Sequence, residues 1–133
     1  MIVVDTSAIV DRLVARPRSE QLASRLDHAS LRAPHLVDIE FLSALRQLVS
    51  HRALDEADAD AARIAFRHLS IRRYPHVLLH DRIWELRHNL SAYDAAYVAL
   101  SEALEVPLVI ADRRLADAPG HRAEVEVFAR RPW

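Results

Sequence analysis

The chain has 133 residues, of which 51% are hydrophobic and 28% are charged, so its composition is that of one globular domain with a single core, spanning residues 1–133. It has no Cys and all 18 basic residues are Arg, which excludes disulfides, Cys nucleophiles, Schiff-base lysines and the lysine of P-loop proteins. With a net charge of −1, any affinity for nucleic acid has to come from a local patch.

Short apolar runs alternate with longer amphipathic segments along the whole chain. In chain order the pattern predicts a strand at Ile2–Val4, helices at 7–13 and 19–29, a strand at Leu31–Ala33, helices at 36–49 and 55–69, a strand at Ile71–Arg73, helices at 77–86 and 92–104, and strands at Leu108–Ala111 and Val125–Phe128. Because parallel strands need helical crossovers, this alternation predicts an α/β domain with a mostly parallel central sheet of four to five strands and helices on both faces.

The same pattern carries two smaller expectations. Trp84, in the predicted helix 77–86, is interpreted as a core aromatic rather than as a platform for stacking bases. No window approaches the roughly 20 apolar residues of a membrane span, and the first strand leads to Asp5 without a basic region or cleavage site. We therefore expect a cytoplasmic protein that is not bound to a membrane.

Two acidic residues come directly after predicted strands. Asp5 follows Ile2–Val4, and Asp112 follows Leu108–Ala111. In open α/β sheets, ligands bind outside the carboxyl ends of the strands, so both carboxylates are expected at the binding edge. Either residue could instead serve only as a helix cap or turn residue, because Asp is a favoured N-cap.

Two further acidic positions lie on predicted helices. Asp94 stands in a capping-box pattern that begins at Ser91, so it could do no more than satisfy the helix start, but it could also face the same edge as Asp5. On the helix 36–49, Glu40 borders the apolar arc, while Asp38 lies even more squarely among apolar neighbours. Helical geometry leaves the choice between Asp38 and Glu40 open.

Four acidic side chains at one sheet edge would repel one another unless a cation lay among them. Oxygen ligands without His or Cys suit Mg²⁺ or Mn²⁺ rather than Zn²⁺. Such an ion can activate water for attack on a phosphodiester and stabilise the negative charge that develops. The chemistry that these acids imply is therefore phosphodiester hydrolysis.

At these positions the chain resembles the VapC toxins of the PIN-domain family. The resemblance is collinear from Met1 to the last strand, and its most specific part is the helix that contains Tyr93-Asp94-Ala95-Ala96-Tyr97. The other matching segments are Val3-Val4-Asp5-Thr6-Ser7-Ala8, the acidic residue Glu40, and Ala111-Asp112-Arg113-Arg114-Leu115. The resemblance implies a three-layer α/β/α fold and a metal-dependent endoribonuclease that acts as the toxin of a toxin–antitoxin pair.

The resemblance also implies roles for individual residues. The acidic set that binds Mg²⁺ or Mn²⁺ and carries catalysis would be Asp5, Glu40, Asp94 and Asp112. Thr6 or Ser7 would help to orient ligands or phosphate. The partners that it implies are an RNA substrate, a second copy of the chain in a homodimer, and a small VapB-like antitoxin whose C-terminal segment lies across the active groove.

Some nearby residues depart from the family pattern or add to it. Ile110 stands where the family usually has a hydroxyl residue two positions before the last acid, and Glu105 stands where a Gly is common. Loss of that hydroxyl could weaken the support of the metal ligands. Arg113 and Arg114 are candidates to contact RNA phosphates, and Asp117 is either a spare acid or an exposed loop residue.

Two other functions remain as alternatives. A phospho-acceptor receiver module also gathers acids around Mg²⁺, but such modules use a lysine and paired acids after the first strand, where this chain has Thr6 and Ser7. A catalytically silent PIN-like interaction protein is the second alternative, and Ile110 is the residue that favours it. Metal affinity distinguishes the silent protein from the ribonuclease.

Overall fold

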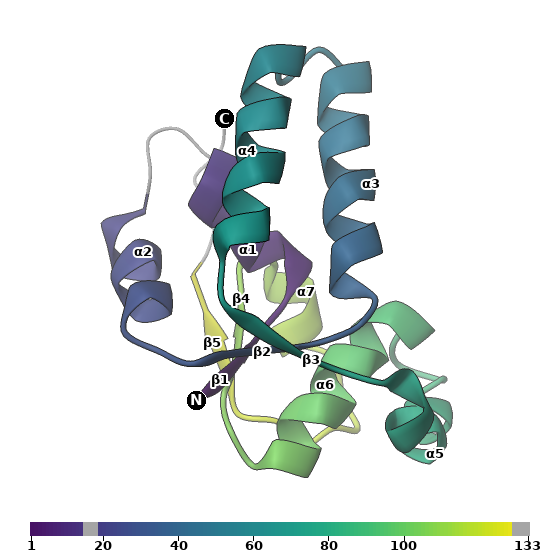
Figure 1. Ribbon diagram of the computed structural model, residues 1–133. Coiled ribbons are helices and arrows are strands. Elements are labelled where there is room, and N and C mark those ends of the chain that lie inside the picture. The colour runs from purple at the N-terminus through teal and green to yellow at the C-terminus, as the bar shows by residue number, and fades with distance from the viewer. Residues whose placement is uncertain (15–18, 129–133) are drawn as a thin grey trace.

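Five parallel strands form one sheet in the computed structural model, which describes residues 1–14 and 19–128 (Figure 1). The strands are β1 (Ile2–Val4), β2 (Leu31–Pro34), β3 (Ile71–Tyr74), β4 (Leu108–Ile110) and β5 (Val125–Val127). Their order is β3-β2-β1-β4-β5, and every neighbouring pair is parallel. The prediction of a mostly parallel sheet with four to five short strands is confirmed.

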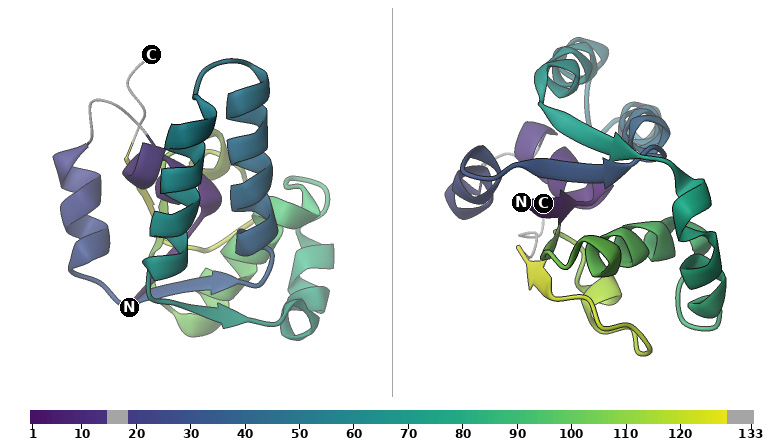
Figure 2. Two further views of the ribbon diagram at one scale, coloured as in Figure 1. Left: turned by 45° about the horizontal axis from the view of Figure 1, so that its top comes forward. Right: turned by 60° about the horizontal axis from the view of Figure 1, so that its bottom comes forward.

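Helices cover both faces of this sheet. They are α1 (Thr6–Val14), α2 (Glu20–Asp27), α3 (Val37–Ser50), α4 (Glu56–His68), the 3₁₀ helix η1 (His76–Leu79), α5 (His80–Glu85), α6 (Ala92–Leu104) and α7 (Arg113–Ala116). Helices α1, α3 and α4 pack against one another, and α6 packs against β1, β2 and β4. The right-hand view of Figure 2 shows α6 on the opposite side of the sheet from α3 and α4. The architecture is therefore the expected three-layer α/β/α arrangement.

The core lies around the two strands β1 and β4. All three residues of each strand are at most 1% exposed, as expected for parallel strands that are covered on both faces. Most of α6 is buried as well, from Ala95 to Ser101. This burial fixes the carboxyl ends of β1 and β4 and the first turn of α6 relative to one another. None of the helices in the described part of the chain is long and apolar enough to cross a membrane.

The sheet order excludes one of the alternative functions. Receiver-type modules have the strand order 2-1-3-4-5, in which the first and third strands are neighbours. Here β1 lies between β2 and β4, and β3 is at the edge of the sheet. The receiver interpretation is therefore wrong.

The prediction of one helix over residues 77–86 is also wrong, because the segment divides into η1 and α5. At the junction, Leu79 has φ −108° and ψ −1°, which ends the 3₁₀ turn. Apolar spacing over four residues does not distinguish a 3₁₀ turn from an α-helical one. The short helix α7, directly after Asp112, was not predicted at all.

Trp84 is not a core aromatic, contrary to the expectation. Its side chain is 67% exposed, and the guanidinium of Arg87 lies over its ring at 4.5 Å from the centroid. Leu86, two residues further on, is 1% exposed and occupies the buried position instead. Residues two apart on a helical turn face different ways, so only one of the two can be buried.

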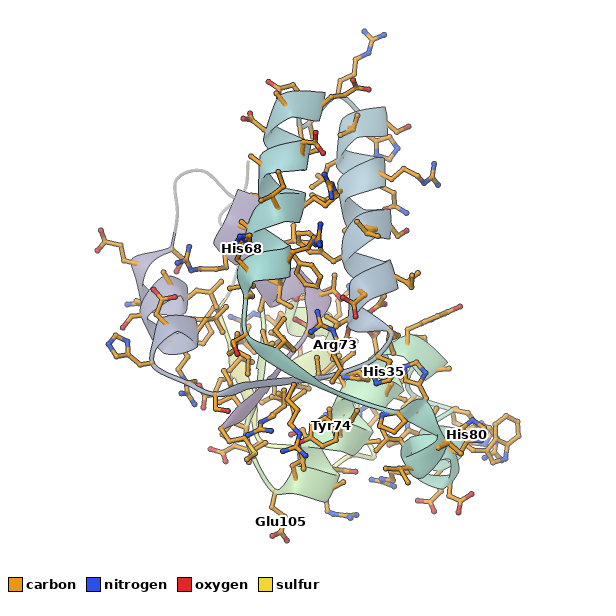
Figure 3. All side chains as sticks on the ribbon, in the orientation of Figure 1. His35, His68, Arg73, Tyr74, His80 and Glu105 are labelled. Carbon is orange, nitrogen blue, oxygen red and sulfur yellow. The ribbon has the colours of Figure 1, made fainter. Side chains whose placement is uncertain are left out.

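Glu105 ends α6 in the left-handed conformation, with φ 55° and ψ 45°. Its N–H donates to the carbonyls of Glu102 and Ser101, an arrangement that closes many helices and usually uses Gly. Figure 3 shows Glu105 at the far end of α6 from the α3–α4 hairpin. The left-handed conformation at this position therefore explains why Gly is common here in the resembling family.

Glu105→Gly should stabilise the protein by about 0.5–1 kcal/mol, because Gly has no Cβ that would clash with the backbone at positive φ. Differential scanning calorimetry should show a melting temperature that is higher by about 2–6 °C. Ala103→Gly, in the last turn of the same helix, is the control, and it should lower stability by about 0.5–1 kcal/mol. A fall in melting temperature for Glu105→Gly would contradict the assigned conformation.

Candidate active site

A pocket opens at the carboxyl ends of β1 and β4 and is lined by all four acids that the sequence predicted. Asp5 follows β1 and Asp112 follows β4, while Glu40 lies in the first turn of α3 and Asp94 in the first turn of α6. The other lining residues that contact these acids are Thr6, Ser7, Ser91, Tyr97 and Arg114. Side chains from four distant segments therefore meet at one edge of the sheet.

Asp5 is the most deeply buried of the four acids, at 7% exposed. Its Oδ1 accepts hydrogen bonds from Ser7 Oγ at 2.7 Å and from the N–H of Ala8 at 3.0 Å. Burial, and to a smaller extent the carboxylates of Asp94 and Glu40, raises the pKa of Asp5 to about 7 despite these two bonds. A nearby cation would therefore stabilise the ionised form of Asp5.

The carboxylate of Glu40 forms a triangle with two hydroxyl groups. Its Oε1 accepts from Tyr97 Oη at 2.7 Å and from Thr6 Oγ1 at 3.0 Å, and the two hydroxyl oxygens lie 2.9 Å apart. Tyr97 is 2% exposed, so the triangle anchors the carboxylate from the core side. The pKa of Tyr97 is raised, first by burial and then by its contact with Glu40, which keeps its hydroxyl protonated.

The structure also decides between Asp38 and Glu40. Asp38 accepts a forked pair of bonds from Arg73 of β3, with Nε at 2.6 Å and Nη2 at 2.8 Å. Figure 3 shows Arg73 at the foot of α3. The guanidinium of Arg73 therefore neutralises the charge of Asp38. Glu40 is the acidic residue of α3 that lines the pocket.

Asp94 and Asp112 both line the pocket, and the charge of Asp112 acts on Asp94. Partial burial raises the pKa of Asp94, and the charge of Asp112 raises it further, while Ser91 and Arg114 lower it. Asp112 receives a forked contact from Arg114, whose Nη2 lies 2.8 Å from Oδ2 and whose Nε lies 3.2 Å from both oxygens. A cation of the chain itself, the guanidinium of Arg114, therefore contacts Asp112 and also lowers the pKa of Asp94.

Ser7 supplies a hydroxyl at the end of β4, beside Ile110, which stands where the resembling family usually has a hydroxyl residue. Ile110 is fully buried in β4, and the next N–H, from Ala111, donates to Ser7 Oγ at 2.9 Å. Since Ser7 Oγ also donates to Asp5, one hydroxyl joins the end of β4 to the first acid. The residue at 110 leaves this link intact.

Two of the suggested supporting residues lie outside the pocket, and one contributor was missed. Arg113 and Asp117 are exposed and do not line it. Tyr97 was quoted only as part of a motif, although it holds Glu40. Its position three residues after Asp94, on the same face of a helix, was the signal that could have identified it.

The donor set suits a hard divalent cation. Four carboxylates line the pocket, and within the described residues Asp5 Oδ2 and Glu40 Oε2 have no hydrogen-bond partner. No three His, Asp or Glu side chains of the described ranges stand close enough together to form a complete metal cage. Mg²⁺ is commonly held by one or two carboxylates and retains several waters, so these residues fit it without such a cage.

An ion pair between α5 and α6 supports the rim of the pocket. Arg82 donates from Nε and Nη2 to the two oxygens of Glu102, at 2.7 and 3.0 Å, and Glu102 is 2% exposed. Arg82 Nη2 also reaches the carbonyl of Gly120, and the N–H of Arg122 donates to Glu102. The segment that follows α7, which includes the pocket residue Ala118, is thereby tied to α6.

The comparisons identify the family and agree with this fold. The model of the PIN domain family, described as "PIN domain", matches residues 2–121, so the chain belongs to the PIN-domain family. It is 46% identical to the VapC ribonuclease Mb0985 of Mycobacterium bovis, over 98% of this chain and all of that protein. The resemblance that the sequence suggested is therefore confirmed.

Solved structures share the fold at low identity. The protein PAE2754 from Pyrobaculum aerophilum has a TM-score of 0.68 and 23% identity, covering 93% of this chain and 82% of its own. VapC20 from Mycobacterium tuberculosis, described as a sarcin-ricin loop cleaving toxin, has a TM-score of 0.64 and 21% identity, covering 87% of this chain and 93% of its own.

Tyr97→Phe removes the hydroxyl that donates to Glu40 and should weaken the binding of Mn²⁺ about tenfold, because the partners of a metal ligand fix its orientation. Isothermal titration calorimetry measures this affinity. Tyr93→Phe makes the same chemical change at a residue that is 65% exposed and lies outside the pocket, so it should bind Mn²⁺ as the unaltered chain does. Equal affinities for all three proteins would refute the role given to Tyr97.

Glu102→Gln should lower the free energy of unfolding at pH 7 by about 1.5–3 kcal/mol. Burial alone would raise the pKa of Glu102, but the bonds from Arg82 and Arg122 outweigh it and the pKa is lowered. The ion pair therefore stabilises the fold above the ordinary Glu pKa, and this stabilisation is lost as the pH falls through the ordinary value and then through the lowered one.

Urea unfolding of both proteins over a range of pH checks this, and their difference in stability should shrink below about pH 4. Glu85→Gln removes a 62% exposed partner of the same Arg82, so it should cost less than about 0.5 kcal/mol. A difference that stays constant down to acid pH would mean that the charge of Glu102 is not what holds the segment.

Proposed function

We propose that this chain is a divalent-metal-dependent endoribonuclease and the toxin of a toxin–antitoxin pair. The observation that carries the proposal is the pocket itself, where Asp5, Glu40, Asp94 and Asp112 meet at the carboxyl ends of two buried strands. The family membership and the 46% identity to a VapC ribonuclease support the same reading. Metal-assisted hydrolysis of RNA is the chemistry for which this set of side chains is suited.

Mg²⁺ or Mn²⁺ is the proposed cofactor, and the same four acids would hold it directly or through water. When bound, such an ion supplies a Lewis acid and lowers the pKa of water. Charge and donor type support the choice, because four oxygen donors of like charge line one pocket without His or Cys.

The remaining polar residues have positioning roles in this proposal. Ser7 holds Asp5 against the end of β4, and Thr6 and Tyr97 hold Glu40 in its rotamer. Arg114, at the rim, is placed to meet a phosphate group, while Arg113 is at most a contact for phosphates further along the RNA. Asp117 has no part in the chemistry of the pocket and is proposed to be a loop residue.

The proposed partners are single-stranded or looped RNA, a VapB-like antitoxin and a second copy of the chain. They follow from the family to which the chain belongs. Ribosomal RNA that includes the sarcin-ricin loop is a reasonable first substrate, since the structurally similar VapC20 is described as cleaving that loop.

The silent interaction protein remains the second candidate. It draws support from the spacing of the acids, of which no three within the described ranges form a complete cage. This candidate predicts neither Mn²⁺ binding nor cleavage, so the experiment below separates it from the ribonuclease.

The test is to incubate the purified chain, freed of any antitoxin, with total RNA and Mg²⁺ or Mn²⁺. Discrete fragments should form, and they should disappear with EDTA and in Asp5→Asn and Glu40→Gln, by a factor of at least about 100 in rate. Asp38→Asn is the matched control, because Asp38 is on the same helix as Glu40 but is bound to Arg73. It should cut the same sites.

Two outcomes would reject the proposal. Cleavage that persists in Asp5→Asn would mean that the active site is elsewhere or that a contaminant cuts the RNA. Intact RNA in every reaction, together with no heat of Mn²⁺ binding, would reject the ribonuclease in favour of the silent interaction protein.

A further inference from the structure

Arg114 is the only basic side chain among the described residues that line the pocket. Its guanidinium and its backbone N–H both contact the carboxylate of Asp112, with the N–H at 3.0 Å from Oδ1 and Nη2 at 2.8 Å from Oδ2. Both oxygens of one predicted metal ligand are therefore engaged by a cation that belongs to the chain.

The ion pair between Arg114 and Asp112 is weak and can dissociate at little cost in free energy. The side chain of Arg114 is 91% exposed, and an ion pair so exposed to water gains little from its charges. The ion pair of Arg82 and Glu102 differs in both respects. The side chain of Glu102 is only 2% exposed, and the pair connects α5, α6 and the segment around Gly120. The guanidinium of Arg114 can leave Asp112 without loosening the fold.

We propose that Arg114 is an internal counter-ion that exchanges with the divalent cation and then binds the RNA phosphate. The proposal rests on the proposed function. Without the ion, the guanidinium offsets the charge of Asp112. The entry of a divalent cation among Asp94 and Asp112 competes for the same oxygens and repels the guanidinium.

The displaced guanidinium remains at the rim, because the backbone of Arg114 is held by the bond from its N–H to Asp112. It presents a planar fork of N–H donors, which matches two oxygens of a phosphodiester. RNA therefore meets a free arginine only when the ion is in place. Ion and phosphate should each raise the affinity of the other by the same factor, since such coupling is reciprocal.

The test measures Mn²⁺ affinity by isothermal titration calorimetry for the unaltered chain, Arg114→Ala and Arg46→Ala. Without its competitor, Arg114→Ala should bind Mn²⁺ about fivefold more tightly or better. Arg46→Ala removes an equal charge from an exposed site on α3 outside the pocket, and its affinity should stay within about twofold. In an Asp112→Asn background, Arg114→Ala should have no further effect on the affinity.

The second arm repeats the titration with a short single-stranded DNA oligonucleotide, which supplies phosphodiesters. The oligonucleotide should raise the Mn²⁺ affinity of the unaltered chain and should leave that of Arg114→Ala unchanged. In steady-state cleavage of RNA at saturating Mn²⁺, Arg114→Ala should raise KM with little change in kcat.

The possible failures are distinguishable. If the unaltered chain binds Mn²⁺ and cleaves RNA, but Arg114→Ala binds Mn²⁺ no more tightly, the exchange is overturned and the ribonuclease stands. If tighter binding is found but the oligonucleotide acts equally on both proteins, the phosphate half of the proposal is wrong. If the unaltered chain neither binds Mn²⁺ nor cleaves RNA, the proposed function fails and the exchange fails with it.

Discussion

Repulsion among carboxylates in a partly buried pocket is the constraint on which the rest of the site depends. Asp5 is affected most, since burial together with the charges of Asp94 and Glu40 raises its pKa to about 7. Three of the four acids have hydrogen-bond donors that stabilise their charge. Asp5 has a hydroxyl and a backbone N–H, Glu40 has two hydroxyls, and Asp112 has a guanidinium. These partners fix the positions of the acids but neutralise only one of them, so the pocket retains its attraction for a cation.

The sheet brings the acids together because β1 and β4 are neighbours and run parallel. Their register pairs Val4 with Val109, so the chain leaves both strands at the same edge, one or two residues before an acid. The buried helix α6 packs on both strands, which brings its first turn, with Asp94, to this edge. The backbone N–H of Asp5 donates to the carbonyl of Val109, so β1 is held to β4 up to the first of the acids. Positions about a hundred residues apart in sequence thus share one pocket.

The parts of this arrangement that could be predicted from the sequence are those with a short-range signal. Buried strands appear as continuous apolar runs, and the acids at their ends follow from the chain direction. The choice between Asp38 and Glu40 could not be made from a helical wheel, because it depends on Arg73, which comes from β3. Trp84 was misplaced for a similar reason, since α5 buries none of its own residues and Leu86, directly after it, is the buried position. Contacts between elements decide such cases.

Capping a helix and binding a ligand do not exclude each other for these acids. A carboxylate has two oxygens and can serve both roles. Asp5 Oδ1 accepts from the N–H of Ala8 and caps α1, while Oδ2 has no partner in the described residues. Asp112 Oδ1 likewise accepts the N–H of Arg114 at the start of α7. A cap holds the carboxylate in one rotamer, so that its second oxygen is already oriented when a cation arrives and less conformational entropy is lost on binding. The capping preference that seemed to weaken the case for a metal site is therefore part of how such a site is built.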